Sequence, residues 1–125
     1  MVKTIKITVR NQISVVELSD WSLEEKAKAI GAEYVEIVRT QRMYDLFGDM
    51  VVMIVDGMGL VENKPVNLAA SYFYGADEHD CMIAGDILLG VERSPDNFPL
   101  AHPEAVKRVL MERFPVLWEG SCPDS

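Results

Sequence analysis

The chain has 125 residues, of which 49% are hydrophobic and 26% are charged, a composition typical of one folded domain and unlike that of a disordered chain. Twelve Lys and Arg residues against twenty Asp and Glu residues give a net charge of −8, which argues against direct binding to nucleic acid or to an anionic membrane, because both need cationic surface. Two cysteines cannot form a disulfide framework, and neither a secretory signal nor an apolar run of roughly 18 residues is visible, so we expect a cytoplasmic protein.

The first thirty residues predict two strands followed by a helix. Apolar and polar residues alternate over Lys3–Val9, and Ile13–Leu18 follows a polar turn, which is the pattern of two half-buried neighbouring strands. Ser22–Glu25 fits a capping box, and Gly31 supplies a left-handed stop. We therefore expect a helix that ends just before this glycine.

The middle of the chain predicts a central strand with shorter elements around it. Tyr34–Val38 is rich in β-branched and aromatic residues and predicts a third strand, whereas Thr40–Asp49 is interpreted as a connection. Met50–Val55 has no polar face, which predicts a strand buried on both sides. Asp56–Gly59 is typical of a tight turn, and Leu60–Glu62 is interpreted as a short return strand.

The segment Asn67–Gly75 predicts a helix with an Asn cap and a glycine stop. It is apolar almost all round, so we expect it to pack into the sheet or against a second copy of the chain, which makes a homodimer a prediction. Cys81–Ala84 and Ile87–Val91 are interpreted as strands on either side of a turn or bulge at Gly85 and Asp86.

The last third of the chain predicts a loop, a helix and a tail. Ser94–Pro99 has loop chemistry, and Pro103 is a good first position for a helix that ends near Phe114. Val116–Ser125 is interpreted as an arm or a disordered tail. The chain is therefore expected to be a single compact α+β domain over residues 1–115, with a mostly antiparallel sheet packed with about three helices, and a tail over 116–125.

The triplet His79-Asp80-Cys81 is the most suggestive combination of reactive side chains. A Cys beside a His can act as a nucleophile or a metal ligand, but adjacent residues of an extended chain point to opposite faces. A zinc site would need Cys81, Cys122, His79 and His102 to converge without the usual paired spacing. We therefore predict no catalytic residues, no metal and no cofactor.

A second candidate site is an anion or nucleotide site before the middle helix. Asn63, Lys64 and Asn67 surround a turn that leads into a helix start, where backbone amides favour an anion. Arg39 and Arg42 could add further positive charge. The same residues are also explained by a turn followed by an Asn cap, and both interpretations stay open.

Acidic residues are concentrated in one stretch of the sequence. Residues 43–92 contain one basic residue, Lys64, against nine acidic residues, which accounts for the whole net charge of −8. A localised acidic surface steers a protein toward a cationic partner. We predict that such a partner binds Asp77, Glu78, Asp80 and Asp86, although acidic loops around buried strands also simply favour solubility.

A set of glycine-containing and apolar motifs occurs in a familiar order: Ile54–Gly57, Gly59–Leu60, Pro65–Ala69, Tyr74–Gly75 and Ile83–Gly90. They resemble a family of small uncharacterised proteins, labelled only as a domain of unknown function, from phages, plasmids and conjugative elements of Gram-positive bacteria. The resemblance covers about Lys3 to Val91. It implies an accessory gene of a mobile element, a group that includes inhibitors of host defence, and it implies no catalytic residues.

Three hypotheses follow. The first is a non-enzymatic interaction protein that blocks a basic host or rival-element protein through an acidic face, as a host-defence inhibitor would. The second is a small-molecule binder, such as a sponge for a nucleotide signal. The third is a small enzyme that uses His79 or Cys81, and it is the least favoured because few polar residues are expected to converge.

Overall fold

Seven strands and four helices form within residues 1–75, 81–93 and 96–119, the part of the chain that this computed structural model describes. In chain order they are β1 (Val2–Ile7), β2 (Gln12–Leu18), α1 (Leu23–Ile30), β3 (Val35–Val38), α2 (Gln41–Phe47), β4 (Val51–Asp56), α3 (Leu68–Tyr74), β5 (Ile87–Arg93), β6 (Asp96–Pro99), α5 (Pro103–Arg113) and β7 (Trp118–Glu119). The predicted α+β class and mostly antiparallel sheet are confirmed, with one helix more than expected.

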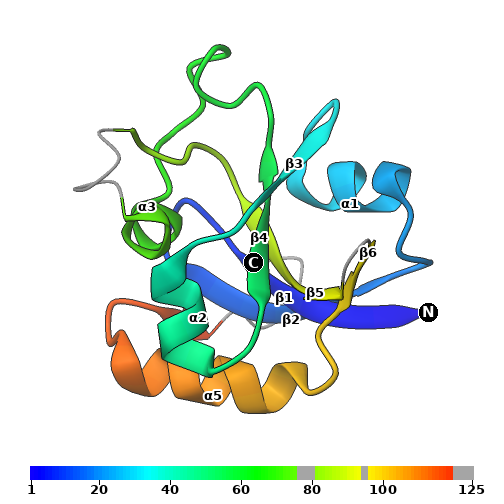
Figure 1. Cartoon of the computed structure of the whole chain (residues 1–125). Coiled ribbons are helices and arrows are strands. Elements are labelled where there is room, and N and C mark those ends of the chain that lie inside the picture. Colours follow the sequence, from blue (N-terminus) through cyan, green and yellow to red (C-terminus); the bar gives the residue numbers. More distant parts are fainter. Residues whose placement is uncertain (76–80, 94–95, 120–125) are drawn as a thin grey trace.

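The strands form one sheet in the order β3-β4-β5-β1-β2-β7, and β6 pairs with β5 beside this path. All pairings are antiparallel except that of β2 with the short β7. Figure 1 shows α1 on one face of the sheet and α2, α3 and α5 on the other. The sheet is therefore the middle of three layers.

The strand β4 is buried along its whole length, as its apolar run predicts. Val51, Met53 and Val55 pack into the larger apolar cluster beneath α2, α3 and α5, whereas Ile54 packs into a smaller cluster beneath α1. Side chains of a strand alternate between the two faces of a sheet, so an unbroken apolar run requires a layer on each face.

The helix α1 has the predicted boundaries. The Ser22 hydroxyl oxygen accepts a hydrogen bond from the Glu25 amide at 3.2 Å, and Gly31 ends the helix at φ 68°. The prediction that α3 packs into the sheet is confirmed for Phe73, which is buried. Its ring lies 5.2 Å from that of Phe114 at the end of α5, in an edge-to-face arrangement. Oligomeric state stays a prediction.

The prediction of a connection over Thr40–Asp49 is wrong, since most of this segment forms the helix α2. The Thr40 hydroxyl oxygen accepts a hydrogen bond from the Met43 amide at 3.2 Å, and Gly48 ends the helix at φ 65°. Both signals are in the sequence. The helix has seven residues and only Met43 is fully buried, so no apolar periodicity marks it.

Three further predictions of local structure are wrong, one of a loop and two of strands. Part of the predicted loop Ser94–Pro99 forms β6, because it lies beside β5 and pairs with residues 90–93. Leu60–Glu62 is a turn, in which the Glu62 amide bonds the Met58 carbonyl at 2.9 Å. Residues 81–84 do not form the predicted strand. Ala84 alone pairs with Val66, in an isolated antiparallel bridge. For residues 96–99 a neighbouring segment decided the outcome more than local composition did.

The start of the predicted tail is docked on the domain. Leu117 is buried, and Trp118 Nε1 donates a hydrogen bond to the Arg10 carbonyl at 2.9 Å. Residues 118 and 119 then pair in parallel with the start of β2. The remainder of the predicted tail, 120–125, lies outside the described residues. Docking of Leu117 covers apolar surface of the larger cluster that would otherwise face water.

Asn67 joins three parts of the fold from a fully buried position. Its Oδ1 accepts a hydrogen bond from the Ala70 amide at 3.0 Å and so caps α3. Its Nδ2 donates to the Ile7 carbonyl at 3.1 Å and to the Gly85 carbonyl at 3.0 Å. The predicted Asn cap is confirmed, and the same side chain ties α3 to the end of β1 and the start of β5.

We expect Asn67→Ala to lower the free energy of unfolding by about 3 kcal/mol, because it removes a helix cap and leaves buried carbonyls without a donor. The change is measured as a shift of the urea midpoint at constant slope. Leu68→Ala is the matched control, since Leu68 is exposed in the first turn of the same helix, and it should shift stability by less than about 0.5 kcal/mol. Equal effects of the two substitutions would contradict this role of Asn67.

Candidate functional site

The predicted partner-binding acids fall into two groups. Asp77, Glu78 and Asp80 lie outside the described residues, so their role stays a prediction. Asp86 is described and half-buried. Its Oδ1 accepts a hydrogen bond from the Val9 amide at 3.1 Å, and its Oδ2 lies 3.7 Å from Lys6 Nζ. Asp86 therefore holds the end of β1 against the start of β5, whatever else it binds.

Five of the six described acids of the stretch 43–92 are paired with a cation, three of them with a cation from outside the stretch. Glu92 accepts hydrogen bonds from Arg39, and the Arg39 guanidinium lowers the pKa of the Glu92 carboxyl. Asp49 accepts two hydrogen bonds from Arg93, at 3.1 and 3.0 Å, and its pKa is lowered for the same reason. Cations from outside the stretch thus compensate three of its described acids, whereas Asp77, Glu78 and Asp80 lie outside the described residues.

The residues predicted to bind a small anion are engaged within the chain and divided between two ends of the β3–β4 pair. Arg39 follows Val38, which pairs with Met53, whereas Lys64 reaches Asp56 at the other end of β4.

The rest of this predicted set also has partners. Arg42 donates to the Tyr72 carbonyl at 2.6 Å and lies over the Tyr72 ring. The Asn67 side chain is engaged in the hydrogen bonds described above, which cap α3 and tie it to β1 and β5. Asn63 adopts a left-handed turn conformation at φ 57°. The structure therefore does not bring Arg39, Arg42, Asn63, Lys64 and Asn67 together.

Lys64 and Asp56 connect the turn after β4 to the rest of the domain. The Asp56 side chain is 1% exposed; its Oδ1 accepts from the Met58 amide at 2.8 Å, and its Oδ2 pairs with Lys64 Nζ. The same ammonium donates to the Gly31 carbonyl at 2.7 Å. Hydrogen bonding to Asp56 raises the pKa of Lys64. These contacts are structural, and they leave neither charge free for a ligand.

Uncompensated negative charge lies in a different part of the described chain. Residues 20–36, from the end of β2 through α1 to β3, contain five acidic residues and two lysines. Lys26 is buried: its Nζ lies 4.8 Å from the centre of the Trp21 ring and donates to Asn97, and burial lowers its pKa. None of the five acids forms an ion pair with a described residue; they are Asp20, Glu24, Glu25, Glu33 and Glu36.

The strand β3 is at the edge of the sheet formed by the described residues, with β4 as its neighbour on one side and no described strand on the other. The Gly57 amide bonds the Tyr34 carbonyl at 3.2 Å, which identifies Tyr34 as a hydrogen-bonded position of this antiparallel pair. Hydrogen-bonded positions alternate along such a pair. The backbone groups of Val35 and Ile37 therefore point away from β4, toward the free edge.

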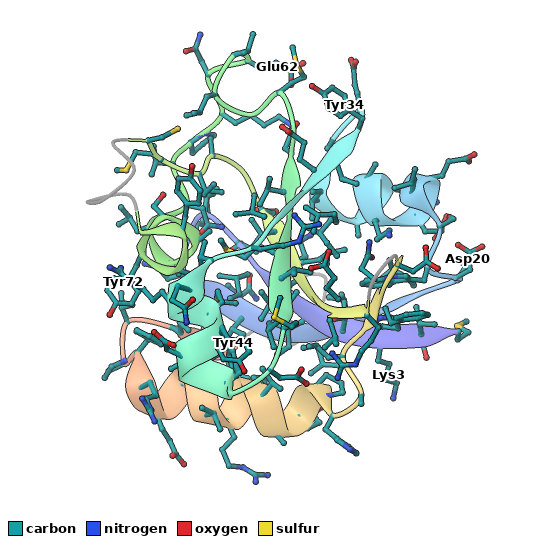
Figure 2. The ribbon with its side chains drawn as sticks, in the orientation of Figure 1. Lys3, Asp20, Tyr34, Tyr44, Glu62 and Tyr72 are labelled. Atoms are coloured by element: carbon teal, nitrogen blue, oxygen red, sulfur yellow. The ribbon has the colours of Figure 1, made fainter. Side chains whose placement is uncertain are left out.

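A concave surface adjoins this edge on the face of α2 and α3. It is a pocket of about 220 Å³ that extends from Glu36 and Val38 of β3 across Val55 to Met82. Tyr34, the residue just before β3, lies near the turn after β4, in which Glu62 is also labelled (Figure 2). We call the outward backbone groups of Val35 and Ile37, together with this pocket, the β3 edge site.

A larger pocket of about 350 Å³ lies at the opposite end of β4, between α2, β6 and α5. Its walls are mostly apolar, with Phe47, Val91 and Phe98 among them. The charged groups at this pocket, Asp49 and Arg93, are paired with each other. Its volume suits a small ligand, but it offers no unpaired charge from the described residues to orient one.

Reactive side chains do not converge in the described part of the chain. Cys81 is exposed and lines the pocket beside β3, whereas His102 lines the pocket beside α5. No three His, Cys, Asp or Glu residues among those described are arranged to hold a metal ion. His79 and Cys122 lie outside these residues, so the chemistry of the His79-Asp80-Cys81 triplet stays a prediction.

Within the described ranges, no helix has the length and apolar character needed to cross a bilayer.

Comparison with known proteins assigns no relative to this fold or site: no family model, curated protein or solved structure matches the chain. The resemblance to proteins of mobile elements therefore stays a prediction.

Sequence reasoning missed the β3 edge site. The strand itself was predicted over Tyr34–Val38, but its place at the edge depends on strand order, which no local pattern specifies. The signal available was Glu36, a charged residue in the middle of an otherwise apolar run. Charges in short strands are common at sheet edges, where they discourage unwanted pairing.

We expect Lys64→Met to lower the free energy of unfolding by about 2 kcal/mol at neutral pH, because it leaves the buried Asp56 carboxylate without its cation. Denaturant unfolding measures the difference. Asp56→Asn combined with Lys64→Met should recover most of the loss, and Lys28→Met, at an exposed lysine of α1, should have little effect.

This stability difference should also depend on pH in a defined direction. Because Asp56 raises the native pKa of Lys64 above its ordinary value of 10.5, the contribution of the pair is complete below that value and is lost as the pH rises through the native pKa. The gap between wild type and Lys64→Met should therefore narrow above pH 10.5. A gap that narrowed toward acid while staying constant in alkali would contradict this assignment.

Proposed function

We propose that this chain is a non-enzymatic interaction protein that binds a basic protein, and that it serves a phage or another mobile element by blocking a host or rival factor. The observation that carries the proposal is the coincidence of uncompensated acids over residues 20–36 with an open strand edge at β3. An open edge supplies hydrogen bonds to any backbone, and the surrounding charge selects among partners.

The alternative, a binder of small nucleotide signals, is less favoured because the cations predicted for it are engaged within the chain. Arg39 pairs with Glu92, and Lys64 pairs with Asp56. A phosphate would have to displace these carboxylates before it could bind. An acidic partner is disfavoured for the same reason, whereas a basic one meets free carboxylates.

The proposal is tested by capture from a lysate of a Gram-positive host followed by mass spectrometry, with salt and charge variants as controls. We expect a basic protein to be retained at low salt and released as salt rises, because exposed charges are screened. Replacing Glu24, Glu33 and Glu36 by Gln should weaken binding of that protein by about tenfold.

A matched control removes the same number of charges elsewhere. Glu17→Gln, Asp45→Asn and Glu112→Gln change three exposed acids outside residues 20–36, and none of the three pairs with a described cation. This control should bind within about threefold of wild type. Asp77→Asn, Glu78→Gln and Asp80→Asn form a third arm that tests the acids predicted from the sequence. Binding that is indifferent to salt and to all three sets would refute the proposed function.

A further inference from the structure

The β3 edge site has two parts that point to one kind of ligand. The outward N–H and C=O groups of Val35 and Ile37 can pair with an added strand, as free edges of sheets do in peptide recognition. The adjoining pocket can take a side chain from that strand, because it begins at β3 itself, with Glu36 and Val38 in its wall.

The walls of the pocket define which side chain fits. Val38, Val55 and Met82 are apolar, and they suit an aliphatic stem. Two of the described lining residues carry a carboxylate, and one of them, Asp56, is already paired with Lys64. Glu36 is exposed and has no cation partner among the described residues. A long apolar stem that ends in a positive charge matches both features.

We infer that the β3 edge site binds an extended segment of a basic protein, which adds a strand to β3 and places a Lys or Arg side chain in the pocket beside Glu36. This inference rests on the proposed function and names the element of the partner that is recognised. Glu36 bonds to β4 through its backbone, so it is a non-hydrogen-bonded position toward an added strand. At such positions facing side chains lie closest, which favours an ion pair there.

A second copy of the chain is a poorer occupant of the same edge. An antiparallel self-pair that places Val35 opposite Ile37 of the other copy would set the two Glu36 side chains directly opposite each other. Like charges at facing positions destabilise a pair of strands, and inward or edge charges are a known protection against edge-to-edge association. A basic segment places a Lys or Arg opposite Glu36, so that attraction replaces the repulsion between two Glu36 side chains.

The test selects displayed random linear peptides of about ten residues for binding to the whole chain, and then measures the affinity of the enriched peptides by fluorescence anisotropy. We expect enriched peptides to contain a Lys or Arg flanked by β-branched residues. On binding, the amides of Val35 and Ile37 should gain protection from hydrogen exchange. Peptides without a cationic residue, or protection elsewhere in the chain, would overturn the inference.

Two single variants separate the pocket from general electrostatics. Glu36→Gln should weaken the selected peptide by about tenfold, whereas Glu33→Gln, which removes an equal charge outside the pocket lining, should weaken it by less than about threefold. Equal losses of peptide affinity in the two variants would mean that charge alone attracts the peptide, and would overturn the role of the pocket. A stable dimer whose Val35 and Ile37 amides are already protected would assign the edge to a second copy, against the inference.

The results also distinguish this inference from the proposed function. If a captured basic protein keeps its salt-sensitive binding in Glu36→Gln, the interaction role stands and strand addition at β3 is wrong. If the selected peptides bind as expected but no basic protein is captured, the chemistry of the edge site stands and the proposed function is wrong.

Discussion

The pairing of two buried strands, β4 and β5, is the constraint on which the rest of the structure depends. All six residues of β4 are buried, and they face apolar layers on both sides. Because β5 pairs with one edge of β4, β3 pairs with the other edge and becomes the outermost strand on that side. The burial of β4 therefore creates the edge strand that carries the candidate site.

Charge compensation decides which surface is available to a partner. Three of the described acids over 43–92 meet cations that come from elsewhere in the chain, as Glu92 meets Arg39 and Asp86 approaches Lys6. The acids around α1 and β3 meet none among the described residues, and the one fully buried cation of that segment, Lys26, is enclosed by Trp21 and Asn97. Net charge per segment is thus a poor guide to surface charge when strands from distant segments lie side by side.

The elements that were predicted correctly are those with local causes. Ser22 and Gly31 delimit α1, Asn67 caps α3, and the apolar run over 51–55 forms the central strand. One miss has a non-local cause: 96–99 became a strand because β5 extends beside it. The helix α2 was missed although its Thr40 cap and Gly48 stop are local, because a seven-residue helix with one fully buried side chain shows no apolar periodicity. The candidate site also has a non-local cause. The free edge of β3 follows from the order of the strands, and its pocket is formed by residues distant in the sequence, such as 36 and 82. Glu36 alone could be suspected from the sequence.

Amide hydrogen exchange along β3 in the free protein, followed residue by residue by NMR, tests the central claim most directly. An open edge predicts alternation: the amides of Glu36 and Val38, which face β4, should exchange slowly, and those of Val35 and Ile37 should exchange rapidly. Slow exchange at all four positions in the monomer would show that the edge is already covered. Rapid exchange at all four would show that β3 is not a stable strand, and either result would contradict the account.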